Sequence, residues 1–168
     1  MLIRPATKDD LPAVSAIYDH HAQSSVSTFD HETPGPDYWL AKVGASGTGE
    51  HLLVVANDDE VRGYAESGVF RPRPAYDHTR EVSVYLGLDA RQQGYGRKLY
   101  DDLLGRLRAD GIHVALAVIA LPNPASEALH RSCGFTQVGV MREVGWKFGA
   151  WVDTGWWQLQ LGEESPAR

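Results

Sequence analysis

The sequence predicts a single domain of the mixed α/β class. Stretches with strand and helix patterns follow one another in the order β-α-α-β-β-β-α-β-α-β-β, and the strict alternation of a doubly wound sheet is absent. With 168 residues, of which 43% are hydrophobic and 23% charged, the chain can bury one globular core. We place the domain at residues 1–161 and a C-terminal tail at residues 162–168.

The N-terminal half contains signals for three strands and two helices. A strand at residues 3–6 precedes a helix at residues 8–23, whose apolar residues recur at helical spacing. Thr7 suits the N-cap of this helix, and Asp10 stands three residues later, as in a capping box. We expect a shorter helix around residues 38–43, and strands at 52–56 and 61–70 joined by a turn at 57–60.

The C-terminal half begins with a strand at residues 80–86, in which apolar and polar residues alternate. Its apolar residues Val82, Val84 and Leu86 should therefore share one face. A glycine-containing turn and an amphipathic helix ending near Gly111 follow. We then expect a strand at 114–119, a helix at 124–132 and two closing strands, the last ending at residue 161.

Charge, hydropathy and cysteine content argue against several classes of function. A net charge of −6 disfavours nucleic acid as a partner, because binding it requires a basic face. The chain has no apolar run near the roughly 20 residues that a membrane span needs. Its first residues lack the layout of a signal peptide, and its one cysteine, Cys133, cannot form an internal disulfide. We therefore expect a cytoplasmic protein.

A glycine-rich loop, Arg91-Gln92-Gln93-Gly94-Tyr95-Gly96, lies between the strand at 80–86 and the long helix. Its glycines allow backbone N–H groups to form a concave surface at the positive end of the helix dipole, which favours phosphate. A Walker loop would need Lys and Ser or Thr after Gly96, where Arg97 and Lys98 stand. A dinucleotide fingerprint would need a third glycine in place of Leu99. A plain glycine-rich turn is the alternative.

This loop and the order of elements resemble the GNAT (GCN5-related N-acetyltransferase) superfamily. The resemblance implies the fold of that superfamily, a mostly antiparallel central sheet that splays between two parallel strands and is flanked by about four helices. It also implies acetyl-CoA as co-substrate, and we expect no metal. The residues that it assigns to acetyl-CoA are Val84, Tyr85, Leu86, Arg91, Gln92, Gln93, Gly94, Tyr95, Gly96, Arg97, Asn123 and Ser126.

Three residues after the glycine loop each allow more than one interpretation. Asn123 can reach an amide of the pantetheine arm, or it can cap the following helix. His130 occupies a position at which many superfamily members carry a Tyr that protonates the departing thiolate. That role passes to His130 or to solvent, unless His130 is a packed helix residue. Cys133 lies one helical turn away, but nothing indicates a lowered thiol pKa, so we set aside a Cys–His nucleophile.

Most of the chain, about residues 3–161, is similar to the family of phosphinothricin and methionine sulfone N-acetyltransferases. The segments that carry this similarity are Ser27–Asp30, Phe70–Tyr76, Glu81–Tyr85, Leu121–Asn123, Leu129–His130, Lys147–Gly149, Trp151–Asp153 and Trp157–Gln158. The similarity implies N-acetylation of a small anionic amino-acid analogue, an activity associated with herbicide or antibiotic resistance.

The family similarity also implies roles for acceptor-binding residues. Glu81 corresponds to the general base, which must deprotonate an amine whose pKa is near 8. Arg71 and Arg73 each offer a planar fork suited to a phosphinate, sulfonyl or carboxylate group, although exposed arginines often only solubilise. The expected walls of the acceptor pocket are Phe29, Tyr76 and Tyr85, each of which core packing explains nearly as well.

Two alternatives to this function stay open. The acceptor could be a polyamine, an aminoglycoside or a protein N-terminus, although Arg71 and Arg73 disfavour the first two because these are cationic. The domain could also be a non-catalytic CoA-binding module, which the combination of Glu81, Asn123 and the glycine loop disfavours. We expect a homodimer, because the C-terminal strands are rich in tryptophan and relatives commonly associate through this region.

Overall fold

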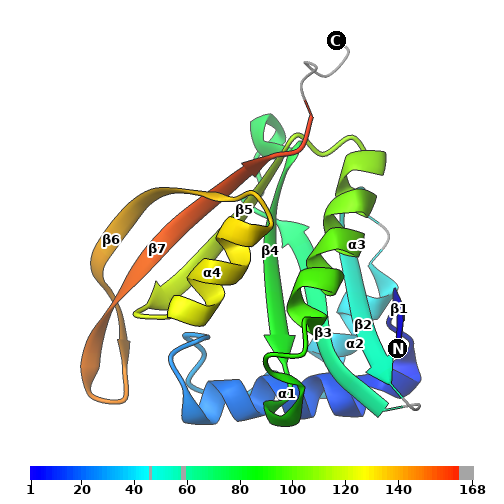
Figure 1. Cartoon of the computed structure of the whole chain (residues 1–168), viewed down its shortest axis with the longest axis horizontal. Helices are drawn as coiled ribbons and strands as arrows, with labels where there is room; N and C mark the ends of the chain where they lie inside the picture. Colours follow the sequence, from blue (N-terminus) through cyan, green and yellow to red (C-terminus); the bar gives the residue numbers. More distant parts are fainter. Residues whose placement is uncertain (46, 58–59, 163–168) are drawn as a thin grey trace.

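A seven-stranded mixed sheet forms the centre of the computed structural model, which describes residues 1–45, 47–57 and 60–162 (Figure 1). The strand order is β1-β2-β3-β4-β5-β7-β6. The strands are β1 (Leu2–Pro5), β2 (His51–Asn57), β3 (Glu60–Val69), β4 (Thr79–Leu86), β5 (Val114–Leu121), β6 (Thr136–Lys147) and β7 (Ala150–Gln160). The α-helices in these ranges are α1 (Leu11–Ser24), α2 (Pro36–Gly44), α3 (Tyr95–Ala109) and α4 (Pro124–Ser132). Short 3-10 turns occupy Lys8–Asp10, Pro74–Tyr76 and Leu88–Ala90.

The sheet separates two hydrophobic cores because successive strand residues point to opposite faces. On β2, Leu53 and Val55 pack into the core beneath α3, whereas Leu52 and Val54 pack into the core formed with α1 and α2. The predicted alternation on β4 is confirmed in the same way, since Val82, Val84 and Leu86 all contribute to the α3 core while Tyr85 packs on the other side.

The strands β4 and β5 are parallel neighbours, whereas every other neighbouring pair in the described ranges is antiparallel. The parallel pairing covers only Thr79–Glu81 of β4 and Val114–Leu116 of β5, although both strands continue for several residues. Each strand remains paired on its other side, β4 with β3 and β5 with β7. The prediction of a mixed sheet that splays between two parallel strands is therefore confirmed.

The predicted elements all occur, in the predicted order, with bounds that differ by a few residues. The helix expected at 8–23 begins as a 3-10 turn at Lys8–Asp10 and continues as α1. Residues 58–59 of the expected turn, and all of the expected tail except Gly162, lie outside the described residues. Among the described residues, no helix is long and apolar enough to cross a membrane.

The hairpin of β6 and β7 extends beyond the other strands at one side of the sheet (Figure 1). Two irregularities interrupt its register, between Gln137 and Gly139 and between Met141 and Gly145. Its outer surface is strongly apolar, and its exposed hydrophobic side chains are Val138, Val140, Met141, Val144, Trp146, Phe148 and Trp151. Large hydrophobic side chains exposed together in one hairpin mark a candidate interaction surface.

The start of α1 is held by the carboxylate of Asp10. This carboxylate accepts hydrogen bonds from the Thr7 N–H (2.7 Å), the Thr7 hydroxyl (2.9 Å) and both terminal nitrogens of Arg4 (2.6 and 2.8 Å). The Arg4 guanidinium, more than the Thr7 bonds, lowers the pKa of Asp10 to about 2. The expected capping box is thus confirmed and joins β1 to α1.

The substitution Asp10→Asn should lower the free energy of unfolding at pH 7 by about 2 kcal/mol. Because the pKa of Asp10 is lower in the folded than in the unfolded chain, this contribution is present above about pH 4 and is lost as the pH falls toward 2. Urea denaturation of both proteins at pH 7 and pH 3 measures it. The exposed neighbour Asp9, changed to Asn, is the control. An Asp10→Asn deficit independent of pH would contradict the assignment.

Candidate active site

A cavity of about 660 Å³ lies where β4 and β5 separate. Its side walls are residues 82–86 of β4 and residues 118–120 of β5, whose facing edges are not paired with each other. The glycine loop with the start of α3, the start of α4 and the end of α1 complete the lining. The cavity thus combines helix N-termini with backbone groups from two strand edges.

The glycine loop turns into α3 through two left-handed residues, Gln92 (φ 61°) and Gly94 (φ 78°). Gly94 is the N-cap of α3, and a Cβ built there would meet nothing within 4 Å, so the position requires glycine for its backbone conformation. Gly96 instead requires space, since a Cβ there would lie 3.1 Å from Leu129 Cδ2 of α4. Both glycines line the cavity. The first N–H groups of α3 have no partner within the helix, and they lie at the cavity wall.

Not every residue assigned to the glycine loop lies on the cavity wall. Arg91, Gln92 and Arg97 line the cavity, and Arg97 also donates from Nε to Asp101 Oδ1 (2.8 Å). Gln93 instead donates to the backbone carbonyl of Asp89, and Tyr95 is buried in the core. These last two residues stabilise the loop and do not face the cavity.

Asn123 caps α4 and also lines the cavity. Its Oδ1 accepts a hydrogen bond from the Ser126 N–H (3.1 Å). The two interpretations of Asn123 are therefore compatible, because the oxygen serves the cap while the amide nitrogen can still donate to a ligand. Ser126 lines the same wall.

His130 is buried against the inner wall of the cavity, with 3% of its surface exposed. Its Nδ1 lies 2.8 Å from the Ser126 carbonyl oxygen, which can only accept, so Nδ1 carries the proton. Its Nε2 lies 3.0 Å from the Tyr100 hydroxyl and accepts from it in the neutral ring. Burial lowers the pKa of His130, and burial raises the pKa of the Cys133 thiol. Both ring nitrogens of His130 are thus engaged by other groups, so His130 does not act as a base for the Cys133 thiol.

Glu81 is half-buried at the last position where β4 pairs with β5, directly before the first β4 residue of the cavity wall. Burial, and secondly the carboxylate of Glu66, raise its pKa, while the Lys42 ammonium opposes this. Glu66 itself pairs with Lys42, with 2.6 Å between Oε2 and Nζ. Across the strands Glu81 faces Gly68, where a Cβ would meet nothing within 4 Å. The space beside Glu81 on this face of the sheet is therefore open. The raised pKa means that its carboxylate is protonated up to a higher pH than that of an ordinary Glu.

Glu81 itself does not line this cavity, and of the other predicted acceptor residues only Tyr85 does. Tyr85 stacks on Tyr64 with 5.4 Å between ring centroids. Arg71 and Arg73 are exposed in the loop before β4, next to Phe70, whose ring contacts that of Tyr76. Phe29 packs on the backbone of the β6–β7 hairpin instead.

Several cavity residues lie outside the set predicted to form the site. They are His21, Ser25, Ser27, Val82, Ser83, Tyr100, Val118, Ile119, Ala120, Ala125 and Leu129. His21 is the clearest example, because its Nε2–H donates to the Leu86 carbonyl oxygen of β4 (3.0 Å), 65 residues away. That contact depends on where α1 ends in space, which no local pattern encodes.

The profile of the acetyltransferase (GNAT) domain family matches residues 3–156 of the chain. The chain belongs to this family of acetyltransferases. Its relatives include a phosphinothricin N-acetyltransferase from Streptomyces coelicolor, 38% identical over 165 residues that cover 95% of each chain. An L-methionine sulfoximine/L-methionine sulfone acetyltransferase from Pseudomonas aeruginosa is 39% identical over 95% of this chain and 94% of the relative.

The structure of this acetyltransferase is similar to that of a phosphinothricin acetyltransferase from Sinorhizobium meliloti in complex with acetyl-CoA. The two superpose with a TM-score of 0.93 and 35% identity, over 99% of this chain and 91% of the other. The predicted membership of the superfamily and of the phosphinothricin and methionine sulfone group is confirmed by these similarities.

The imidazole of His130 should remain neutral at pH 6.5, with its proton on Nδ1. Burial in the protein disfavours the charged ring, so its midpoint of titration should lie below the ordinary value of 6.5. Heteronuclear NMR of the ¹⁵N-labelled ring measures both the tautomer and the midpoint. A ring that titrates above pH 6.5, or that carries its proton on Nε2, would refute the hydrogen-bond pattern.

Proposed function

We propose that this acetyltransferase moves the acetyl group of acetyl-CoA to the amine of a small anionic amino-acid analogue, with Glu81 as general base. The observation that carries this proposal is the position of Glu81. It is a half-buried carboxylate with a raised pKa at the point where β4 and β5 part, and it directly precedes Val82, the first β4 residue of the cavity lining. The pKa of a general base is most useful when it is raised toward the working pH.

The residues around the cavity fit acetyl-CoA. The N–H groups at Gly94–Arg97 suit the pyrophosphate, because they combine free donors with the positive end of the α3 dipole. The unpaired edge of β4, residues 82–86, can pair with the amides of the pantetheine arm as a neighbouring strand would. The amide nitrogen of Asn123 offers a further donor on the opposite wall.

The chain can assist the transfer at three points: removal of a proton from the amine, stabilisation of the oxyanion, and protonation of the thiolate. Glu81 accepts a proton from the ammonium group of the acceptor, directly or through water, and thereby frees the lone pair that attacks the thioester carbonyl. Backbone N–H groups of β4 at Val84–Leu86 donate to the oxyanion that forms at that carbonyl. As the intermediate collapses, the nitrogen, positively charged after the attack, releases its second proton to solvent, and the departing thiolate takes a proton from His130 or from solvent. His130 must first become charged for this role, which its burial opposes.

The anionic acceptor is proposed from the exposed loop before β4 and from the names of relatives. Arg71 and Arg73 are exposed in this loop, and guanidinium groups bind phosphinate or sulfonyl oxygens in a bidentate manner. Phosphinothricin and methionine sulfone, two of the compounds named for the relatives, carry a phosphinate and a sulfonyl group respectively. Phe29, Tyr76 and Tyr85 are the proposed apolar walls for the acceptor.

We also propose a homodimer. The exposed apolar surface of the β6–β7 hairpin, which includes Trp146 (50% exposed) and Trp151 (60% exposed), is the surface that a second copy would cover. The cytoplasm is the proposed compartment.

A thiol-release assay with acetyl-CoA and a panel of amines tests the proposed acceptor class. Phosphinothricin and methionine sulfone should release CoA thiol with the highest kcat/KM, ordinary amino acids should be slower, and spermidine should not react. The cationic polyamine is the discriminating member, because Arg71 and Arg73 repel it. Preference for spermidine would overturn the anionic class, and CoA binding without any acetylated amine would favour a non-catalytic module.

The substitution Glu81→Gln should reduce kcat/KM for the best amine by roughly 100-fold or more, since proton transfer by a positioned base contributes about that much. The Kd of CoA, measured by calorimetry, should change little. Activity of the unaltered protein should also fall as the pH drops below the raised pKa of Glu81. Glu60→Gln, an exposed carboxylate on β3, is the control. An unchanged rate for Glu81→Gln would remove it as the base.

A further inference from the structure

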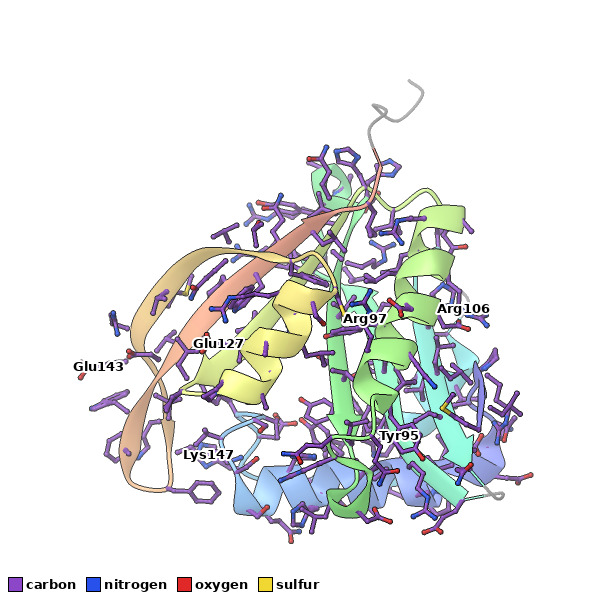
Figure 2. All side chains as sticks on the ribbon, in the orientation of Figure 1. Tyr95, Arg97, Arg106, Glu127, Glu143 and Lys147 are labelled. Atoms are coloured by element: carbon purple, nitrogen blue, oxygen red, sulfur yellow. The ribbon has the colours of Figure 1, made fainter. Side chains whose placement is uncertain are left out.

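The loop that follows α1, residues 25–30, is bound to the β6–β7 hairpin by Lys147. The Lys147 ammonium donates a hydrogen bond to the backbone carbonyl oxygen of Thr28 (2.7 Å), across 119 positions of sequence. Both ends of this bond are buried, with 2% of Lys147 and 9% of Thr28 exposed. In Figure 2, Lys147 lies between the hairpin and this loop.

A second contact joins the same two segments. Phe29 packs its ring on the backbone of the hairpin at Gly145, so closely that a Cβ there would lie 2.4 Å from ring atoms of Phe29. The hairpin therefore holds the loop at two successive residues, Thr28 by a hydrogen bond and Phe29 by packing.

The loop is also anchored to α1, beside the cavity. The Tyr18 hydroxyl lies 2.6 Å from the Thr28 hydroxyl and donates to the Asp30 carboxylate (2.5 Å). The Tyr18 ring in turn contacts the ring of Tyr85, a cavity residue, at 5.3 Å between centroids. A shift of the loop would therefore disturb the cavity wall.

The other side of the loop faces the cavity directly, through Ser25 and Ser27. The first part of this loop, Ser25 and Ser27, thus lines the cavity, and the next two residues, Thr28 and Phe29, attach to the hairpin. Lys147 thereby connects the hairpin to the loop that forms one wall of the cavity.

The chemistry of Lys147 is unusual for a residue that only packs. A buried ammonium loses hydration that a hydrogen bond to a neutral carbonyl replaces only in part. Burial accordingly lowers the pKa of Lys147, with a smaller opposing effect from Asp30. The ring of Phe148, 5.1 Å from Nζ, supplies a weak cation–π contact. An aliphatic side chain would fill the same space without the loss of hydration but could not hold the Thr28 carbonyl.

We propose that Lys147 is a positioning residue for the acceptor, and that its bond to the Thr28 carbonyl sets the loop 25–30 as one wall of the acceptor's binding site. The proposal rests on the proposed transfer to a small amine. It assigns Lys147 no contact with the reacting atoms. Its effect is on the affinity for the amine, because the glycine loop and α3, which suit the CoA phosphates, belong to another wall of the cavity.

The test compares Lys147→Met with Lys147→Arg. Loss of a hydrogen bond to a charged donor should raise the KM for the best amine roughly tenfold or more. The Kd of CoA and the kcat at saturating amine should change by less than about threefold. Lys147→Arg should restore most of the amine affinity, because it keeps a buried cationic donor. Arg142→Met is the matched control, since Arg142 is an exposed cation of the same hairpin that pairs with Asp153.

Two measurements keep the test decisive. Lys147→Gln, which removes the ammonium but keeps a polar side chain, should also raise the KM for the amine, and it decides the matter if Lys147→Met does not fold. Hydrogen exchange should show faster exchange at residues 25–30 in Lys147→Met, whatever the activity. An inactive unaltered protein would defeat the proposed function, whereas unchanged amine KM or unchanged exchange in the variants would overturn the role of Lys147.

Discussion

The separation of β4 and β5 is the constraint on which the rest of the structure depends. These strands pair in parallel only as far as Glu81 and Leu116, and then leave two unpaired edges across a cavity. An unpaired strand edge away from water is unfavourable unless another partner takes its hydrogen bonds. The two edges therefore leave backbone groups available to a ligand with amide groups along its length, and Glu81, the last residue of β4 that pairs with β5, is the carboxylate proposed to act on the acceptor.

The glycine loop is the place at which we propose that this acidic protein holds its anionic cofactor. A net charge of −6 offers no general attraction, so the phosphate-binding groups must be local. Gly94 supplies the left-handed turn that aims the start of α3 at the cavity, and Gly96 lets α3 approach α4. Glycine suits the two positions for different physical reasons, conformation at Gly94 and space at Gly96. Both positions lie where the N-terminus of α3 meets the cavity.

The sequence predicted what local patterns encode. The helices, the strands, the capping of α1 and of α4, and the glycine loop all follow from spacing and residue type within a few positions. The places of His21 against Leu86 and of Lys147 against Thr28 did not follow, because these contacts join residues 65 and 119 positions apart.

The candidate site was predicted unevenly for the same reason. Asn123 and Ser126 lie on the cavity as expected, whereas Tyr95 belongs to the core and Arg71 and Arg73 are exposed outside the cavity of the single chain. Residue type indicates which chemistry a side chain can perform. Only the path of the chain in space determines which cavity it reaches.

A crystal structure of the complex with CoA tests the central claim most directly. The claim predicts the pyrophosphate at the N–H groups of Gly94–Arg97, the pantetheine amides paired with β4 beyond Glu81, and the thiol at the Glu81 end of the cavity. A complex in which CoA binds with its pantetheine arm outside the gap between β4 and β5 would contradict it.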